Sequence, residues 1–226
     1  MISGETRLVG LLGDPVSRSL SPLMQNAAFA ARGLDWTYVP LPVAAGRLDD
    51  AVRGLVALGF AGANVTTPHK LAVARLVEAD EPSVNTLVVR DGSILGYSTD
   101  AAVLDQLEFR RAAIVGDGGA AVAFAAILPD APRFSRRETW PPDVSHADLV
   151  VNATSARDEV LFELGSGQTL VDLPYPPTAT ARAAEAAGAR VVDGLDVLVA
   201  QGAASFEMWT AVPAPVDMMR AAVRSA

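Results

Sequence analysis

Short apolar runs alternate with longer segments of helical spacing along almost the whole chain. The first run, residues 8–12, leads through a Gly-Asp-Pro turn into a helical pattern over residues 21–32, with a proline in its first turn. Strands that are separated by helices form parallel sheets covered on both faces. Ligands of such sheets bind at the carboxyl ends of the strands. The chain is therefore predicted to be an α/β protein, and polar residues that directly follow a strand are the first candidates for a site.

The first hundred residues predict one unit of three strand–helix pairs and a hairpin, which an Asp-Gly turn between two apolar runs indicates. Its expected elements are strands at 8–12, 37–39 and 61–65, helices over 21–32, 48–58 and 69–78, and hairpin strands at 85–90 and 94–97. A second unit begins with a strand, a glycine-rich turn and an alanine-rich helix. Its expected elements are strands at 112–115, 149–151 and 170–171, and helices over 120–128, 178–187, 195–210 and 215–226.

Composition narrows the classes of protein to which this chain can belong. Half of its 226 residues are hydrophobic and 19% are charged, which is typical of a folded globular protein. The formal net charge of −8 argues against a nucleic-acid surface, which needs clustered Lys and Arg. The absence of cysteine excludes disulfides, a thiol nucleophile and Cys-ligated metals, and no metal site is expected. Without an apolar stretch of ~20 residues or a signal-peptide pattern, we expect a cytoplasmic protein with no membrane contact.

Several polar residues of the chain have side chains suited to a polyol ligand. They are Ser19, Ser21, Thr66, Asn85, Thr99 and Gln201. Lys70 and Asp100 could form a lysine–carboxylate pair for proton transfer. Taken singly, each also has a structural explanation: Ser21 and the Thr66-Thr67-Pro68 stretch can cap helices, and Lys70 can be a solvated lysine in a first helical turn. The residue types alone leave both interpretations open.

Taken together, the motifs resemble those of the shikimate dehydrogenase family. The stretch VGLLGDPVSRSLSPLMQNAAF is similar to the family's opening motif, in which Ser19 and Ser21 fill two carboxylate-binding positions. GANVTTPHK matches G-x-N-V-T-x-P-x-K and places the family's catalytic lysine at Lys70. VNTLV and GYSTD match the motifs that give Asn85 and the catalytic aspartate, Asp100. These motifs occur in family order over nearly the whole chain.

The later motifs complete the resemblance. GLDVLVAQGAASFEMWT resembles the family's closing motif and gives Gln201, and DLPYPPTAT resembles D-x-x-Y-x-P-x-x-T and gives Tyr175. Together with Thr66, Gln201 and Tyr175 complete the substrate-binding residues that the resemblance implies. The resemblance places the dinucleotide at the glycine-rich turn and at two arginines about twenty residues further on. The implied cofactor-binding residues are Gly116, Gly118, Gly119, Ala120, Arg136 and Arg137.

This resemblance implies a reversible hydride transfer between NADPH and 3-dehydroshikimate, which yields shikimate. Lys70 and Asp100 would manage the proton on the reacting oxygen, because the cofactor itself carries the hydride chemistry. It also implies a substrate domain of residues 1–100 plus 195–226 and a Rossmann-like NADP-binding domain of residues 101–194. The implied partner is a small-molecule substrate, and a monomer and a homodimer are both open.

The nucleotide half departs from the family pattern. The family's G-A-G-G-A loop becomes G-D-G-G-A here, so Asp117 puts a carboxylate near the expected pyrophosphate. The family's next strand ends in N-R-T, whose arginine holds the 2′-phosphate; here residues 133–137 run at once into a Trp-Pro-Pro stretch, with roughly a helix and a strand missing. Further departures are Arg18, Ser98, Ala101 and the loss of a glycine and a methionine after Ser155. We therefore expect a shortened NADP-binding domain, with weakened or lost cofactor binding as an open alternative.

Other functions stay open beside a working shikimate dehydrogenase. A quinate/shikimate-type dehydrogenase would act on a different cyclic hydroxy acid. A sensor or regulatory subunit would keep the substrate-binding residues but bind no dinucleotide. Arg136 and Arg137 would then be solvated turn residues. A nucleic-acid-binding regulator has little support in a chain of net charge −8.

Overall fold

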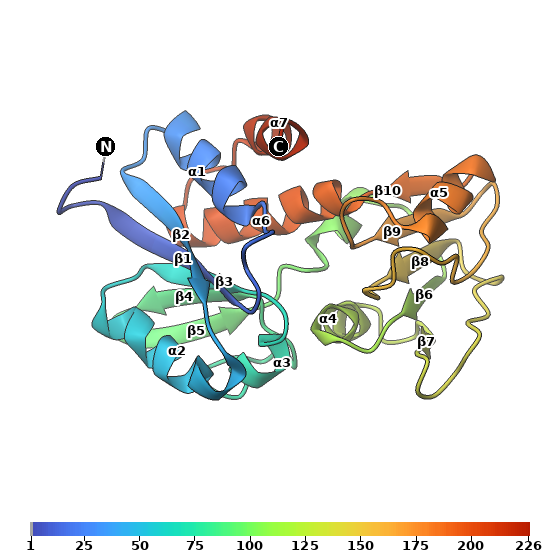
Figure 1. Cartoon of the computed structure of the whole chain (residues 1–226), viewed down its shortest axis with the longest axis horizontal. Helices are drawn as coiled ribbons and strands as arrows, with labels where there is room; N and C mark the ends of the chain where they lie inside the picture. Colours follow the sequence, from blue (N-terminus) through green and yellow to red (C-terminus); the bar gives the residue numbers. More distant parts are fainter. Residues whose placement is uncertain (1) are drawn as a thin grey trace. The chain divides into compact units, whose positions relative to one another are not determined.

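The computed structural model describes residues 2–226, which form two compact units. The first unit combines the N-terminal part of the chain up to Thr99 with residues 199–226, and the second holds residues 100–198. Each unit is built around its own five-stranded sheet (Figure 1). The α/β fold class predicted from the alternating pattern is confirmed.

The sheet of the first unit is mixed, in the order β2-β1-β3-β4-β5. Strands β2, β1 and β3 are parallel, whereas β4 and β5 are added as an antiparallel hairpin. The hairpin turns at Asp91 and Gly92, which both adopt positive φ (54° and 80°), as the predicted Asp-Gly turn requires. The unit contains β1 Arg7–Gly13, α1 Ser21–Ala31, β2 Trp36–Pro42, η1 Ala45–Arg47, α2 Leu48–Ala57, β3 Gly62–Val65, α3 Lys70–Val73, β4 Thr86–Arg90, β5 Ser93–Tyr97 and α7 Val216–Arg224.

Successive residues of β3 serve opposite faces of this sheet, as the period of a strand dictates. Ala63 and Val65 pack into the core that includes Leu48, Val52 and Leu55 of α2. The other face is covered by α1 and by the part of α6 (Gly194–Thr210) that belongs to this unit (Figure 1).

Close contacts hold α6 against the strands. The indole N–H of Trp209 donates to the carbonyl oxygen of Leu87 at 2.9 Å. A Cβ on Gly62 would lie 2.4 Å from Trp209 Nε1, so only glycine lets the helix approach β3 this closely. Phe206 stacks on Phe29 of α1, with ring centroids 5.4 Å apart. These contacts seat one face of α6 on the sheet, which decides where its polar residues lie.

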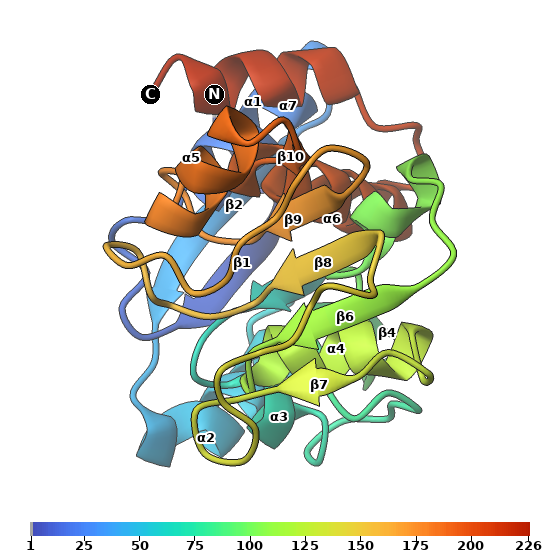
Figure 2. The same cartoon turned by 90° about the vertical axis from the view of Figure 1, so that its right-hand side faces the viewer.

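The sheet of the second unit is fully parallel, in the order β10-β9-β8-β6-β7. Figure 2 looks onto this sheet, with α5 in front of it and α4 behind. The α5 side is packed with small side chains, because Ala181 and Ala184 meet Ala113, Val150 and Leu170. The unit contains η2 Ala102–Gln106, β6 Ala112–Val115, α4 Gly119–Ile127, β7 Arg133–Phe134, β8 Leu149–Asn152, β9 Thr169–Asp172, α5 Ala179–Ala186 and β10 Arg190–Val192.

This order is that of a doubly wound dinucleotide-binding sheet that lacks one edge strand. The full order is 3-2-1-4-5-6, and β7, β6, β8, β9 and β10 occupy positions 2, 1, 4, 5 and 6. Strand β7 has two residues, and residues 135–148 connect it to β8 without a helix or a strand. The predicted shortening is therefore confirmed and lies at the β7 edge.

Three local predictions differ from the structure. The helix predicted over 69–78 is limited to Lys70–Val73. Leu20, not Ser21, holds the N-cap position of α1 and makes no side-chain cap bond, so the proposed capping role of Ser21 is wrong. Ser19 Oγ accepts the first N–H of the helix, that of Ser21. The Thr66-Thr67-Pro68 stretch likewise provides no side-chain cap for α3, which begins after His69. Strands β7 and β10 were not expected as strands, because they are only two and three residues long and each begins with an arginine.

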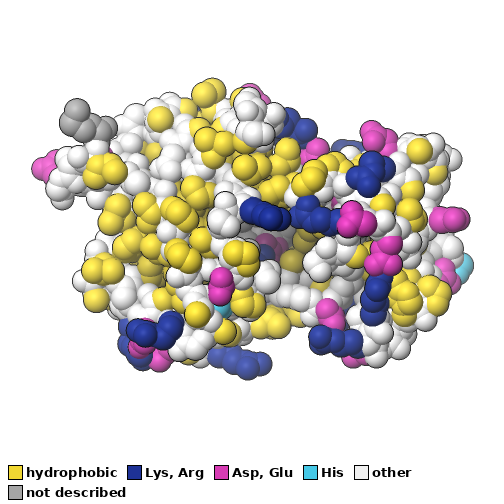
Figure 3. All heavy atoms as spheres, in the orientation of Figure 1, with side chains coloured by type: hydrophobic (Ala, Val, Ile, Leu, Met, Phe, Trp, Pro, Cys, Tyr) yellow, Lys and Arg dark blue, Asp and Glu magenta, His cyan; other side chains and the backbone are white. Residues whose placement is uncertain are grey.

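The surface carries mixed charge on the face that Figure 3 draws. Lys and Arg side chains lie among Asp and Glu side chains there, without a continuous basic patch. This agrees with the net charge of −8. Within residues 2–226, no helix combines the length and apolar character that crossing a membrane requires.

Candidate active site

Two serines follow the end of β1 in one tight loop. The backbone N–H of Ser19 donates to the carbonyl of Val16 at 3.1 Å. Ser19 Oγ lies 3.2 Å from Ser21 Oγ and also accepts the backbone N–H of Ser21 at 3.2 Å. Both hydroxyls therefore meet at the carboxyl end of β1, where the chain enters α1. Paired hydroxyls of this kind suit a carboxylate ligand.

The loop after β3 is joined to the loop after β1. The backbone N–H of Thr66 donates to the carbonyl of Leu12 at 2.8 Å, and that of Asp14 donates to Thr67 at 3.1 Å. A Cβ on Gly13 would lie 2.3 Å from Thr66 Cγ2, so glycine makes room for Thr66 at the end of β1. The structure therefore brings Thr66 to the same sheet edge as the serines.

Lys70 begins α3 directly behind this loop and is half-buried. Its backbone carbonyl accepts the N–H of Val84 at 3.1 Å, which places it beside the start of β4. Lys70 is the single lysine of the chain, and the other 17 of its 18 basic residues are arginines. A lysine can lose its proton near neutral pH when its surroundings favour it, whereas an arginine cannot. The presence of one lysine among 18 basic residues is thus a signal for Lys70 that is independent of the motif around it.

Asn85 is the centre of a buried hydrogen-bond network in the first unit and is 2% exposed. Its Oδ1 accepts the backbone N–H of Thr99 at 2.8 Å and the hydroxyls of Thr99 and Thr86 at 3.1 Å. Its Nδ2 donates to Gln201 Oε1 at 3.4 Å. The structure thus joins two predicted substrate-binding residues, which are 116 positions apart in the chain.

The network rests on buried residues that motif reasoning had not singled out. Asn64 Nδ2 donates to Thr86 Oγ1 at 3.1 Å and to Ser205 Oγ at 2.9 Å. Tyr38 donates its hydroxyl to Asn64 Oδ1 at 2.9 Å. Ser205 lies one helical turn after Gln201 and donates to its carbonyl at 2.9 Å. The signal in the sequence was an asparagine inside the apolar strand β3, because a buried amide side chain needs hydrogen-bond partners.

Asp100 and Tyr175 belong to the second unit. Asp100 is 7% exposed and directly follows Thr99, so the bond from Thr99 to Asn85 also restrains the chain at Asp100. Tyr175 is half-buried in the loop after β9, at the carboxyl end of that strand. Tyr175 thus follows a strand end, as the sequence indicated for site residues, whereas the buried network next to Asp100 was not predicted.

The glycine-rich turn connects β6 to the first turn of α4. Gly116 has φ of +139°, and a Cβ there would lie 2.8 Å from the carbonyl oxygen of Ala153. Gly118 precedes the helix in an extended conformation, and a Cβ there would meet nothing within 4 Å. No side chain caps α4, which begins at Gly119 and continues with Ala120. An uncapped helix start with open backbone in front of it suits an anion.

Both predicted arginines are held by carboxylates of the same unit. Arg137 Nε lies 3.5 Å from Asp117 Oδ2, so the charge that Asp117 brings to the turn is partly offset. Arg136 forms an ion pair with Glu159, and its guanidinium carbon lies 5.0 Å from the centroid of the Trp140 ring. The arginines are thus organised around the carboxyl edge of β6, β7 and β8.

A second buried network fixes two loops at this edge. Asp172, at the end of β9, accepts Asn152 Nδ2 at 2.7 Å and the backbone N–H of Thr178 at 3.1 Å. Asn152 Oδ1 in turn accepts the hydroxyl of Thr154 at 2.8 Å. Burial raises the pKa of the Asp172 carboxyl above its usual value, and the bonds from Thr178 and Asn152 oppose the shift. These residues shape the loop edge and were not predicted as site residues.

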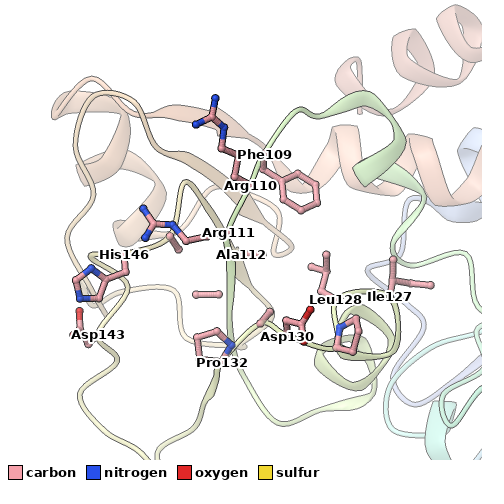
Figure 4. A pocket seen from close by; sticks show the side chains of 14 residues that line it. Phe109, Arg110, Arg111, Ala112, Ile127, Leu128, Asp130, Pro132, Asp143 and His146 are labelled. Atoms are coloured by element: carbon pink, nitrogen blue, oxygen red, sulfur yellow. The ribbon is translucent and has the colours of Figure 1, made fainter.

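A pocket of about 420 Å³ lies at the opposite edge of this sheet, and Figure 4 shows the residues around it. It is formed where β6 begins and α4 ends, by residues such as Arg111, Leu128 and His146. None of the predicted site residues lines it. Among the described residues, no group of three or more His, Cys, Asp or Glu side chains could hold a metal ion.

Two family models match parts of this chain. A model of the shikimate dehydrogenase substrate binding domain matches residues 11–87, and one of the shikimate 5′-dehydrogenase C-terminal domain matches residues 194–224. The NADP(+) shikimate dehydrogenase of Anaeromyxobacter dehalogenans strain 2CP-1 is 41% identical over 271 aligned positions, which cover 98% of this chain and 97% of the relative. That of Moorella thermoacetica is 38% identical, over 100% and 95%.

The chain belongs to the shikimate dehydrogenase family. Solved structures agree: the shikimate 5-dehydrogenase of Thermus thermophilus in complex with NADP(H) and shikimate superposes with a TM-score of 0.86 at 27% identity, covering 97% of this chain and 99% of that one. The quinate dehydrogenase of Corynebacterium glutamicum in complex with NAD superposes with a TM-score of 0.81 at 25% identity, over 98% and 99%.

Within the shikimate dehydrogenase family this chain is short. The alignment to the Anaeromyxobacter dehalogenans relative spans 271 positions, although this chain has 226 residues, so the relative carries residues that this chain lacks. The two-residue edge strand β7 shows where the second unit is reduced. The glycine-rich turn, the uncapped start of α4 and both arginines remain, so the residues present still fit a dinucleotide phosphate group.

Proposed function

We propose that this shikimate dehydrogenase family member reduces 3-dehydroshikimate to shikimate reversibly, with NADPH as the hydride donor. The observation that carries the proposal is the Asn85 network, which joins a strand, the Thr99 backbone and Gln201 of α6. A polar cluster this deeply buried is costly unless its groups are satisfied, and it presents amide groups in fixed positions. Fixed donors and acceptors are what a substrate with several hydroxyl groups needs.

The substrate carboxylate binds the hydroxyls of Ser19 and Ser21 in this proposal. Both serines are oriented by the loop after β1, and their separation of 3.2 Å allows two donors to meet one carboxylate. The ring hydroxyls bind the side chains of Thr66, Asn85 and Gln201 of the first unit and of Tyr175 of the second.

Lys70 and Asp100 handle the proton at the reacting oxygen. When the ketone is reduced, its carbon gains a hydride and its oxygen gains one proton, so a donor must stand at that oxygen. A protonated Lys70 donates this proton, and its neutral amine takes the proton back when the reaction runs in reverse, while the Asp100 carboxylate stabilises the charged form of the lysine. NADPH supplies the hydride when it is bound.

The second unit binds the dinucleotide through its glycine-rich turn. Gly116, Gly118, Gly119 and Ala120 offer backbone N–H groups at the start of α4, and the helix dipole favours an anion there. Arg136 and Arg137 recognise the 2′-phosphate, because a guanidinium makes paired charge-assisted hydrogen bonds to phosphate.

Two observations favour a second candidate, a substrate-binding sensor without turnover. The second unit lacks an edge strand, and Asp117 adds a carboxylate to the phosphate-binding turn. A quinate-type substrate is a further alternative, since a quinate dehydrogenase has the same fold. The cytoplasmic location stays a prediction, and a monomer and a homodimer both stay open.

Shikimate-dependent formation of NADPH by the purified chain, followed by absorbance, tests the proposal. We expect turnover with shikimate and NADP, and slower turnover when quinate or NAD replaces either. Calorimetric titrations with shikimate and with NADP separate the candidates. Binding of shikimate without any binding of NADP would support the sensor, and faster turnover of quinate would move the substrate assignment to that acid.

A further inference from the structure

Arg136 is held from two sides in the second unit. Its guanidinium pairs with the carboxylate of Glu159, which lies in the segment after β8, and its guanidinium carbon lies 5.0 Å from the Trp140 ring centroid. All three side chains are more than a third exposed, with relative exposures of 57% for Arg136, 54% for Glu159 and 39% for Trp140. An exposed ion pair of this kind is weak and is exchanged readily for a stronger anion.

The position of this cluster connects it to the phosphate-binding turn. Arg136 and Trp140 lie on the segment that follows β7, in place of the missing elements of the sheet. The neighbouring Arg137 pairs with Asp117, whose carboxylate belongs to the turn itself. Each of the two arginines therefore has a carboxylate of the chain as its partner before any ligand is present.

We propose that Glu159 is a specificity-determining residue that occupies Arg136 until the 2′-phosphate of the cofactor displaces it, while Trp140 keeps the guanidinium in place. This inference rests on the proposed function, because it requires the adenosine end of a dinucleotide at this edge. A 2′-phosphate carries more charge than a carboxylate and has three acceptor oxygens, so it replaces Glu159. A 2′-hydroxyl is neutral and leaves the pair intact.

Glu159 consequently lowers affinity for adenosine that carries a 2′-phosphate without changing affinity for adenosine with a free 2′-hydroxyl. Its carboxylate must be released from Arg136 and then remains near the bound phosphate, which repels it. Trp140 acts in the opposite sense, since a guanidinium packed on an aromatic face loses less freedom when it binds a phosphate. The segment that replaces the missing strand thus holds the arginine from one side.

Calorimetric titration with adenosine fragments tests this without relying on catalysis. The probes are 2′,5′-ADP, which carries the 2′-phosphate, and 5′-AMP, which does not. Glu159→Gln should tighten 2′,5′-ADP binding by about 2- to 5-fold, the size of one exposed ion pair, and change 5′-AMP binding less than about 1.5-fold. Glu163→Gln is the matched control, since this exposed glutamate of the same unit forms no ion pair among the described residues.

Variants of Trp140 test the second half of the inference. Trp140→Leu should weaken 2′,5′-ADP binding, and Trp140→Phe should retain most of it, because phenylalanine keeps an aromatic face.

An equal gain from Glu159→Gln and Glu163→Gln would show that only net charge matters and would overturn the inference. So would an equal effect on both probes. If neither probe binds the wild-type chain or Glu159→Gln, this inference and the dinucleotide part of the proposed function both fail; binding of 2′,5′-ADP with no change on substitution overturns the inference alone.

Discussion

Thr99 and Asn85 are joined by two hydrogen bonds to one oxygen. The backbone N–H of Thr99 donates to Asn85 Oδ1 at 2.8 Å, and the Thr99 hydroxyl donates to the same atom at 3.1 Å. The amide at the start of β4 therefore holds the chain where it leaves β5, one residue before Asp100. A side chain proposed to orient the substrate thus also restrains the backbone of a residue proposed to manage the proton.

Ser205→Ala should destabilise the first unit without unfolding it. Ser205 is fully buried, and its hydroxyl is within 2.9 Å of Asn64 Nδ2 and of Thr86 Oγ1. Its loss leaves buried polar groups short of a partner, which costs about 1–3 kcal/mol. Urea denaturation measures this change, and Ser93→Ala on an exposed strand end is the control. Equal stability of the two variants would mean that the network contributes nothing to folding.

Lys70→Ala should lower turnover by about 10²- to 10⁴-fold while the fold and shikimate binding persist. Lys70→Arg should restore little activity, because an arginine keeps its proton at neutral pH. Turnover and calorimetric shikimate binding are measured on the same preparations. Wild-type turnover in either variant would remove Lys70 from the mechanism.

Asp100→Asn should act on turnover as Lys70→Ala does. The double variant should lose less than the product of the two single losses, since groups that act together are not additive. Full multiplicativity of the two losses would show that the residues act independently.

Asp117→Ala should tighten NADP binding by up to about tenfold and leave shikimate affinity unchanged. The gain is limited because Arg137, 3.5 Å away, already offsets part of the Asp117 charge. Calorimetry at increasing salt should show the difference shrinking as charges are screened. An unchanged NADP affinity would mean that Asp117 does not face the phosphates.

Arg136→Ala combined with Arg137→Ala should abolish any preference for NADP over NAD. The substitutions remove charge-assisted hydrogen bonds to the 2′-phosphate, so NADP affinity should fall and NAD affinity should change little. Parallel titrations of both cofactors measure the ratio. Equal affinities in the unsubstituted chain would already identify the arginines as surface charge.

Asp148→Asn should remove a source of acid sensitivity in the second unit. The backbone N–H of Arg111 and, to a lesser degree, that of Arg110 hold the pKa of the Asp148 carboxyl below its usual value of 3.8. A lowered folded-state pKa contributes stability above the unfolded value and loses it as pH falls through the folded value. The difference in unfolding free energy between the wild type and the variant should therefore be largest above about pH 5 and shrink below about pH 4. A difference that does not change with pH would contradict this.

Prediction from sequence failed where distant partners overrode local preference. The helical pattern over 69–78 continues beyond Val73, yet the structure ends the helix there. Glu78 donates its N–H to Ile94, and Gly96 donates to Glu78, so this segment adds to the edge of β5 instead. A helix would not form these bonds, whereas the backbone N–H and C=O groups at the edge of β5 need hydrogen-bond partners. Local spacing contains no information about such partners.

The sequence alone determined the alternation of strands and helices, the Asp91-Gly92 turn and the family motifs that contain Lys70 and Asp100. These features depend on residue types that lie close together in the chain, and their periodicity and turn chemistry are local. Only the tertiary structure decided that Asn64, Ser205 and Asn85 share one buried network and that Glu159 lies against Arg136. Asn64 and Ser205 are 141 positions apart, and they meet because α6 packs on the sheet through Trp209 and Gly62. A buried amide accepts whichever partner the packing brings to it, so its role follows from the packing of elements far apart in the chain.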